Sequence, residues 1–254
     1  MSHLPKQQTS PLLEAHQVSK YFGGLAAVKQ VDIAIYAGEI VGLVGPNGSG
    51  KTTLFDCLSR LQSIDRGKII FKGRNITNTR SYQVSRMGLS RTFQKLRVYR
   101  QMTVWENMLV SRQWRGENLL TLFKVTDRQT RRRARELLEL LKLSHLQNEY
   151  AGNLSGGQQR LLEIGMALMP DPEMILLDEA TSGINPTLIE TIKDRIRTLN
   201  REYHKTFLAI EHNINFIADL CDRVYVLDRG EKLAEGTPQE IQANDAVIEA
   251  YFGT

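Results

Sequence analysis

The chain has 254 residues, 41% of them hydrophobic and 24% charged, which excludes extensive disorder and allows one large domain or two small ones. Its net charge of +5 suits nucleic acid, an anionic membrane surface or phosphate ligands, and does not choose among them. No apolar stretch approaches the length of a membrane span, and residues 1–11 are polar without a signal-peptide core. We therefore expect a cytosolic protein with a frayed N-terminal tail.

The first predicted elements are two strands, at residues 12–18 and 31–36, which alternate apolar and polar side chains and should pair antiparallel. Between them, Tyr21 and Phe22 stand beside two glycines. An aromatic side chain in this position is an ordinary hairpin feature, but it could also stack on a nucleobase. The residues alone favour the hairpin interpretation.

Residues 45–53 match the phosphate-binding pattern G-x-x-x-x-G-K-[ST] between an apolar strand at 40–44 and a helical pattern. Glycines let backbone N–H groups approach phosphate oxygens, and a helix starting near Gly50 adds its positive end. Lys51 is expected to reach the β- and γ-phosphates of a nucleotide, and the Thr52 hydroxyl to bind Mg²⁺. The candidate phosphate-binding residues are Gly45, Pro46, Asn47, Gly48, Ser49, Gly50, Lys51, Thr52 and Thr53.

The cysteines Cys57 and Cys221 fall in segments with the apolar spacing of amphipathic helices. This placement favours buried free thiols over a disulfide. Free thiols fit a reducing compartment.

Short strands are expected at residues 67–73 and just before residue 94. The amino-acid composition then changes between residues 98 and 153. Leucine and arginine dominate there, which predicts a helical insertion in an α/β domain. One predicted helix has its apolar face at Ala134, Leu137, Leu138 and Leu141, and its polar face at Arg128, Arg131, Arg132, Arg133 and Arg135. A solvated face lightly paired with Glu136 and Glu139 is favoured over a nucleic-acid contact.

Residues 154–158 read Leu-Ser-Gly-Gly-Gln and open a further predicted helix, with Ser155 as its N-cap. A helix start with a hydroxyl and two bare glycines is a second anion site. Such a cap could serve structure alone. The chain nevertheless carries two helix starts of the phosphate-binding type.

Residues 174–179 read as a continuous apolar strand ending in two acids, Asp178 and Glu179. Ligands of a parallel sheet bind at the carboxyl ends of its strands, so these acids are expected at the edge that carries the phosphate loop. Asp178 is predicted to hold Mg²⁺ through water. Glu179 points elsewhere and is the candidate to polarise the attacking water.

The α/β pattern continues to the end of the chain. Asn185 and Pro186 predict the N-cap and first position of a helix, and residues 206–210 predict a buried strand before Glu211 and His212. Residues 222–228 and 231–235 suggest a hairpin, and 238–252 closing helices.

Five motifs stand in the order of an ATP-binding cassette (ABC) ATPase, and the chain resembles that family over about residues 12–252. They are the phosphate loop, Gln94, Leu154-Ser-Gly-Gly-Gln158, Ile175-Leu-Leu-Asp-Glu179 and His212. The resemblance implies an α/β P-loop NTPase fold: a RecA-like core with an N-terminal antiparallel β subdomain and an inserted α-helical subdomain.

The same resemblance implies domain limits. The polar residues 1–11 are expected to be a disordered tail, and residues 12–254 would form a single ABC ATPase domain. Within that domain, 12–94 and 156–254 belong to the core, and 95–155 to the helical subdomain.

The family's mechanism implies roles for individual residues. Phe22 matches the aromatic that stacks on adenine, with Tyr21 as the second choice. Gln94 matches the residue that senses Mg²⁺ and the attacking water, and His212 the residue that contacts the γ-phosphate. Two subunits would sandwich two ATP molecules head to tail, each site combining one phosphate loop with the partner's Ser155, Gly156, Gly157 and Gln158.

Further stretches are similar to the ATPases of importers for branched-chain and other hydrophobic or neutral amino acids: residues 90–94, 102–107, 210–212 and 236–253. This implies an energy-coupling subunit on the cytoplasmic face of the inner membrane, attached to two transmembrane permease subunits. A substrate-binding protein would take part indirectly, a second ABC ATPase subunit would be identical or different, and no nucleic acid would be involved. One departure is Ala180-Thr-Ser-Gly183, where proline after the glutamate and alanine before the glycine are commoner.

Three alternatives compete with this interpretation. A lipid or lipopolysaccharide exporter ATPase is possible, because the nucleotide motifs encode neither direction nor cargo. A DNA-maintenance ABC ATPase is disfavoured, because the stretch between Gln94 and Leu154 is too short for coiled coils or extra domains. A non-hydrolysing ATP-gated binding module is disfavoured by the intact Glu179.

Overall fold

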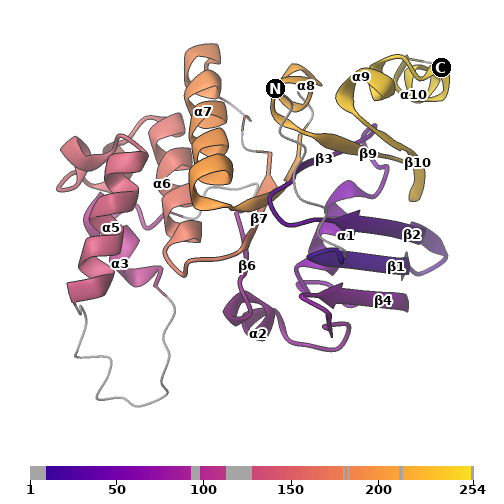
Figure 1. Ribbon diagram of the computed structural model, residues 1–254, viewed down its shortest axis with the longest axis horizontal. Helices are drawn as coiled ribbons and strands as arrows, with labels where there is room; N and C mark the ends of the chain where they lie inside the picture. The colour runs from indigo at the N-terminus through magenta and orange to yellow at the C-terminus, as the bar shows by residue number, and fades with distance from the viewer. Residues whose placement is uncertain are drawn as a thin grey trace.

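The fold is built from two β-sheets with helices around them (Figure 1). This computed structural model describes residues 10–92, 98–112, 128–179, 181, 184–211 and 214–252. Its strands are β1 (Leu13–Phe22), β2 (Leu25–Ile35), β3 (Ile40–Val44), β4 (Arg66–Phe71), β5 (Arg74–Asn75), β6 (Leu89–Arg91), β7 (Met174–Asp178), β8 (Thr206–Ile210), β9 (Arg223–Asp228) and β10 (Glu231–Gly236). Its helices are α1 (Lys51–Leu58), α2 (Ser81–Arg86), α3 (Val104–Val110), α5 (Arg128–Leu140), α6 (Gly156–Leu168), α7 (Pro186–Tyr203), α8 (Ile214–Leu220), α9 (Pro238–Gln242) and α10 (Asp245–Phe252), with 3-10 turns η1 (Ser144–Leu146) and η2 (Ala151–Asn153).

The larger sheet has the order β10-β9-β3-β8-β7-β6, and all neighbours except β10 and β9 run parallel. The carboxyl ends of β3, β6, β7, β8 and β9 therefore share one edge. The phosphate loop follows β3, and Asp178 ends β7, with only β8 between these two strands. This topology brings together motifs that lie far apart in the sequence.

The smaller sheet has the order β2-β1-β4-β5 and is antiparallel. The predicted pairing of the first two strands is confirmed, in a register that sets Leu13 opposite Ile35 and Phe22 opposite Leu25. Both strands run longer than their alternation predicted. Gly23, with φ of 58°, makes the turn that joins them and leaves Phe22 at the tip.

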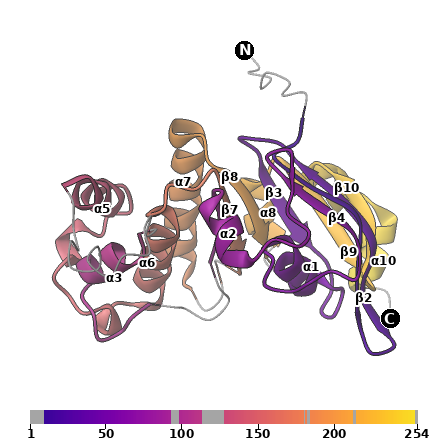
Figure 2. The same cartoon turned by 90° about the horizontal axis from the view of Figure 1, so that it is seen from below.

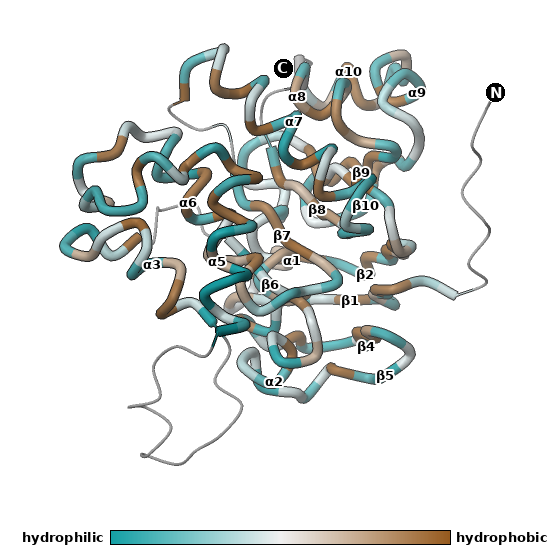
Figure 3. Tube along the Cα trace, turned by 60° about the vertical axis from the view of Figure 1, so that its left-hand side comes forward, coloured by the Kyte–Doolittle hydropathy of each residue, from teal (hydrophilic) through white to brown (hydrophobic). Residues whose placement is uncertain are grey.

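Two hydrophobic cores lie on the two faces of the larger sheet. Ile40 and Val44 of β3 belong to one core, and the alternate residues Val41 and Leu43 belong to the other. The first core receives side chains from α3 and from α5 to α10, and the second from α1 and the smaller sheet. Full burial of each such aliphatic side chain stabilises the fold by about 1.5–3 kcal/mol. In Figure 3 the helices around the sheet alternate between hydrophobic and hydrophilic segments, as helices with one packed face must.

The α3, α5 and α6 helices lie together at the end of the molecule away from the smaller sheet (Figures 1 and 2). The predicted amphipathic helix is confirmed as α5, with Ala134, Leu137 and Leu138 buried. Its arginines lie mostly exposed, and Arg132 pairs with Glu136 at 3.3 Å. The predicted limits of the helical subdomain stay a prediction.

Cys57 and Cys221 are buried free thiols, as the sequence predicted. Burial raises the pKa of Cys57 to about 12, so this thiol stays protonated and unreactive at neutral pH. Within the described ranges, no helix is both long and apolar enough to cross a membrane.

Candidate functional site

An open cavity of about 1010 Å³ lies at the carboxyl edge of the larger sheet. Four parts of the chain line it: the tip of the β1–β2 hairpin, the loop between β3 and α1 with the first turn of α1, the residue after β7, and the turn between β9 and β10. Eight of the predicted site residues meet there: Phe22, Asn47, Gly48, Gly50, Lys51, Thr52, Thr53 and Glu179. Leu25, Ala26, Ala27 and Arg229 also line the cavity, and none of them has a sequence signal that predicted it.

Lys51 is the first residue of α1, and its side chain folds back over the loop. Its Nζ donates hydrogen bonds to the carbonyl oxygens of Gly45 at 2.8 Å and Pro46 at 2.9 Å. Burial lowers the pKa of Lys51, and the nearby charge of Glu179 opposes that effect. The ammonium group therefore lies inside the loop, next to Glu179, where phosphate oxygens would need a cation.

The glycines of the loop are required by close packing. A Cβ on Gly45 would lie 2.1 Å from the carbonyl oxygen of Leu227, and one on Gly50 would lie 2.2 Å from that of Ala27. Gly50 is also left-handed, with φ of 97°, and forms the N-cap of α1. Within the described residues, the buried Ser49 hydroxyl has no hydrogen-bond partner, so a phosphate oxygen could satisfy it. These features fit a nucleotide phosphate.

Phe22 closes the cavity on the side of the hairpin. Its side chain is half exposed, and the ammonium of Lys20 lies 5.5 Å from the ring centroid. Tyr21 does not line this cavity. The tertiary structure thus favours Phe22 over Tyr21 as the aromatic platform.

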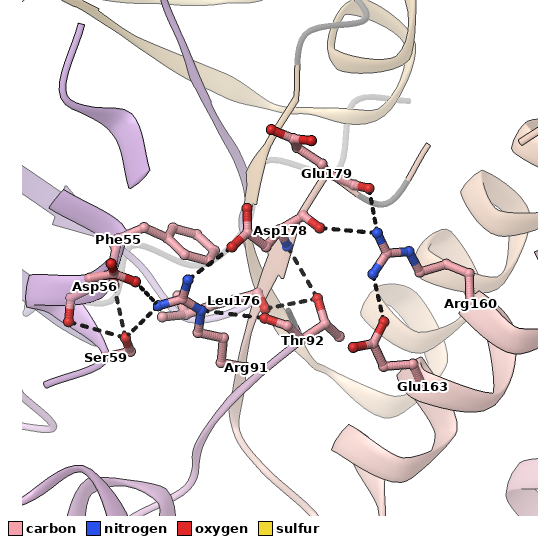
Figure 4. Close-up of polar contacts among 10 residues, drawn as sticks. All are labelled: Phe55, Asp56, Ser59, Arg91, Thr92, Arg160, Glu163, Leu176, Asp178 and Glu179. Carbon is pink, nitrogen blue, oxygen red and sulfur yellow. Dashed lines mark hydrogen bonds and ion pairs between the residues drawn. The ribbon is translucent and has the colours of Figure 1, made fainter. Parts of the chain in front are cut away.

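Asp178 ends β7 as a buried carboxylate held by the end of β6 (Figure 4). Arg91 Nη2 donates to its Oδ2 at 2.8 Å, and the hydroxyl of Thr92 accepts from its backbone N–H at 3.1 Å. Burial raises the pKa of Asp178, while the Arg91 guanidinium acts in the opposite direction. Asp178 is not among the residues that line the cavity at the phosphate loop, whereas Thr52 is. Carboxylate and hydroxyl oxygens are donors of the kind that Mg²⁺ prefers.

Glu179 has a left-handed backbone, with φ of 47°. Its N–H donates to the carbonyl of Ile210 at 3.0 Å, and its own carbonyl accepts from Arg160 Nη2 at 2.6 Å. Figure 4 shows its carboxylate pointing away from Arg160. Glu179 lies at the cavity, which it lines together with Lys51.

The second helix start has the predicted cap. Ser155 Oγ accepts from the N–H of Gln158 at 3.4 Å, and Gln158 Oε1 accepts from the N–H of Ser155 at 2.9 Å. Ser155 and Gly156 are exposed, whereas Gly157 is buried against Leu188. None of these four residues lines the cavity at the phosphate loop. Ser155 and Gly156 thus face outward, while Gly157 packs against the chain's own α7.

Gln94 and His212 lie outside the described residues. Their roles as catalytic residues, and that of Gln94 toward Mg²⁺, stay predictions. The described neighbour of His212, Glu211, is buried and accepts hydrogen bonds from the N–H and hydroxyl of Thr181 at 2.8 and 2.7 Å. This pair ties the end of β8 to the segment after Glu179.

Sequence reasoning missed three residues that contact the predicted site residues: Arg91, Arg160 and Tyr251. Neither arginine carries a clear signal: Arg91 ends the short strand Leu89–Arg91, and Arg160 follows two glutamines in α6. Tyr251 of α10 has no such signal, although a hydrogen bond from the Gly45 backbone acts on its phenol.

A family model described as ABC transporter matches residues 28–182, more than half of the chain. The chain belongs to the ABC transporter ATP-binding family. A second model, described as branched-chain amino acid ATP-binding cassette transporter, matches residues 231–254. The expected enzyme class is confirmed: the chain is an ABC ATPase.

Relatives of this ABC ATPase match along nearly the whole chain. The high-affinity branched-chain amino acid transport ATP-binding protein LivG of Escherichia coli is 37% identical over 252 residues, 96% of this chain and 99% of that protein. The corresponding protein BraF of Pseudomonas aeruginosa is 37% identical over 250 residues, 96% and 98% of the two chains.

Solved cassettes share the fold of this ABC ATPase. A nucleotide-free ATP-binding cassette from an ABC transporter has a TM-score of 0.86 at 35% identity, covering 96% of this chain and all of that one. The ADP conformation of the cassette MJ1267 has the same TM-score and identity, covering 96% and 99%. A dimeric structure of the cassette MJ0796 has a TM-score of 0.76 at 27% identity, covering 89% and 98%. The expected fold class is confirmed.

Proposed function

We propose that this ABC ATPase is the energy-coupling subunit of an importer for branched-chain or other hydrophobic or neutral amino acids. The observation that carries this proposal is the match of residues 231–254 to the branched-chain amino acid cassette model, beside relatives of that class over 96% of the chain. The C-terminal segment matters most, because the nucleotide motifs alone are common to importers and exporters.

In the nucleotide site, Phe22 would stack on adenine and residues 45–53 would surround the phosphates of ATP. Lys51 already lies inside the loop and would transfer its hydrogen bonds from loop carbonyls to the β- and γ-phosphates. Mg²⁺, when bound, neutralises charge that develops on those phosphates. Thr52, Asp178 and Gln94 would hold it.

Hydrolysis requires a group that polarises the attacking water. Glu179 is proposed for this role, because it lines the cavity beside Lys51 while its backbone carbonyl accepts a hydrogen bond from Arg160. His212 is proposed to contact the γ-phosphate.

The second subunit would complete each site. The exposed Ser155 and Gly156 present a capped helix start to a neighbouring copy, and its N–H groups suit a γ-phosphate. ATP binding would close such a head-to-tail dimer, and hydrolysis would reopen it. The partner cassette could be identical or related.

This chain would act at the cytoplasmic face of the inner membrane through two permease subunits, with a substrate-binding protein supplying the cargo. The helical region containing α3 and α5 is the proposed contact with the permease. Domain limits at residues 95 and 155 remain part of this proposal.

The test is co-purification of the tagged chain from native membranes, with identification of the attached subunits and ATP-driven uptake in proteoliposomes. We expect permeases of the branched-chain amino acid class and ATP-dependent uptake of leucine or a similar neutral amino acid. Recovery with exporter subunits, and no uptake, would contradict the proposal.

A further inference from the structure

Arg91 is the last residue of β6, and its side chain reaches the carboxylate at the end of the adjacent strand β7. Arg91 Nη2 donates to Asp178 Oδ2 at 2.8 Å (Figure 4). Both side chains are nearly buried, with exposed fractions of 9% for Arg91 and 4% for Asp178. A charged pair of this kind has little water to compete with it.

The guanidinium is itself fixed by α1, the helix that follows the phosphate loop. Its Nη1 donates to Asp56 Oδ1 at 2.5 Å and to Ser59 Oγ at 3.0 Å, and the group lies 4.8 Å from the ring centroid of Phe55. These contacts use the planar fork of arginine, which a lysine would lack. Arg91 therefore has one defined position.

The residue after Arg91 holds the backbone of the same aspartate. Thr92 Oγ1 accepts from the N–H of Asp178 at 3.1 Å, and the Thr92 N–H donates to the carbonyl of Leu176 at 2.9 Å. Arg91 thus binds the side chain of Asp178, and Thr92 binds its main chain.

The geometry leaves one side of the carboxylate for another ligand. Arg91 takes Oδ2, and Figure 4 shows the other carboxylate oxygen directed away from the guanidinium. A fixed donor that binds one carboxylate oxygen sets the direction of the other oxygen. Hydrogen-bond partners of metal ligands commonly orient those ligands in this way.

We propose that Arg91 is a positioning residue that orients the Asp178 carboxylate for Mg²⁺. This inference rests on the proposed assignment of Asp178 to that ion. Two other roles of Arg91 predict different results for Arg91→Gln. If Arg91 only repels the cation, its loss should strengthen Mg²⁺ binding. If Arg91 only stabilises the fold, its loss should leave Mg²⁺ binding unchanged.

The experiment measures a magnesium gain, defined as the Kd of a non-hydrolysable ATP analogue in excess EDTA divided by its Kd in excess Mg²⁺. Calorimetry on the full-length chain supplies both constants. In Arg91→Gln we expect the gain to fall roughly 10- to 100-fold, with little change of the Kd in EDTA. A gain that is unchanged or larger would overturn the inference.

Arg91→Lys keeps a buried cation between Asp56 and Asp178. It is the second variant to measure if Arg91→Gln does not fold. We expect a smaller fall of the gain, because an ammonium cannot fork between Asp178 and α1. A full gain in this variant would contradict the positioning role.

Two further variants separate the possible failures. Arg223→Gln removes an arginine that is also ion-paired but more exposed, at 21%. It pairs with Glu39 at 2.9 Å and lies far along the sheet in β9, so its loss should lower the melting temperature without changing the gain. Asp178→Asn should lose the gain. If it keeps the gain, the Mg²⁺ assignment is wrong; if it loses the gain while Arg91→Gln keeps it, only the role of Arg91 is wrong.

Discussion

At the scale of single residues, Glu179 shows how a reactive group is held. Non-glycine residues rarely adopt its left-handed backbone, and such strain persists where surrounding contacts impose it. Here the contacts are a hydrogen bond to Ile210 and one from Arg160, which is itself paired with Glu163. The backbone is thereby fixed while the carboxylate remains at the cavity.

Glu179→Gln should leave ATP affinity near the wild-type value and slow hydrolysis at least about 100-fold, because an amide cannot accept the proton of the attacking water. Single-turnover hydrolysis and equilibrium nucleotide binding measure the two effects. Turnover at the wild-type rate would remove Glu179 from the role of base.

Lys51→Ala should abolish tight ATP binding, because the loop loses the cation that its carbonyls now hold. Equilibrium binding of a fluorescent ATP analogue tests this directly, with the melting temperature as the control for folding. Unchanged affinity would count against the assigned phosphate loop.

At the scale of elements, the C-terminal helix α10 reaches the nucleotide loop. Tyr251 packs with Val44 of β3 around an apolar cavity of about 150 Å³, and its phenol receives a hydrogen bond from the Gly45 backbone. Burial raises the pKa of Tyr251, so the phenol stays neutral at physiological pH. The last helix of the chain therefore supports the first residue of the loop.

Tyr251→Phe should weaken ATP binding by about 2- to 10-fold, the effect of one net hydrogen bond. The packing of the ring is kept, so the melting temperature should change little. Isothermal titration with ATP measures the affinity. An affinity equal to that of the wild type would show that this contact does not support the loop.

At the scale of the whole molecule, the two phosphate-type helix starts occupy different places. The start of α1 lines the cavity, and the start of α6 does not. The α6 helix belongs with α3 and α5, away from the smaller sheet (Figure 1). A composite site thus requires a second copy or a related cassette.

Ser155→Arg should block closure, because it places bulk and charge at the shared face. ATPase activity of the variant measures this effect, with the melting temperature as the control for folding. Normal activity of Ser155→Arg would argue against the sandwich.

Local sequence determined much of this protein. The phosphate loop, the Ser155 and Asn185 caps and the apolar strand before Asp178 are each written within a few neighbouring residues, because backbone conformation and capping are local. The family resemblance already favoured Phe22 over Tyr21, and tertiary structure places Phe22 at the cavity. Tertiary structure alone decided that Arg91 and Arg160 hold the end of β7, and that Tyr251 supports Gly45. These partners are brought together by the order of strands in the sheet, and no short stretch of sequence encodes that order.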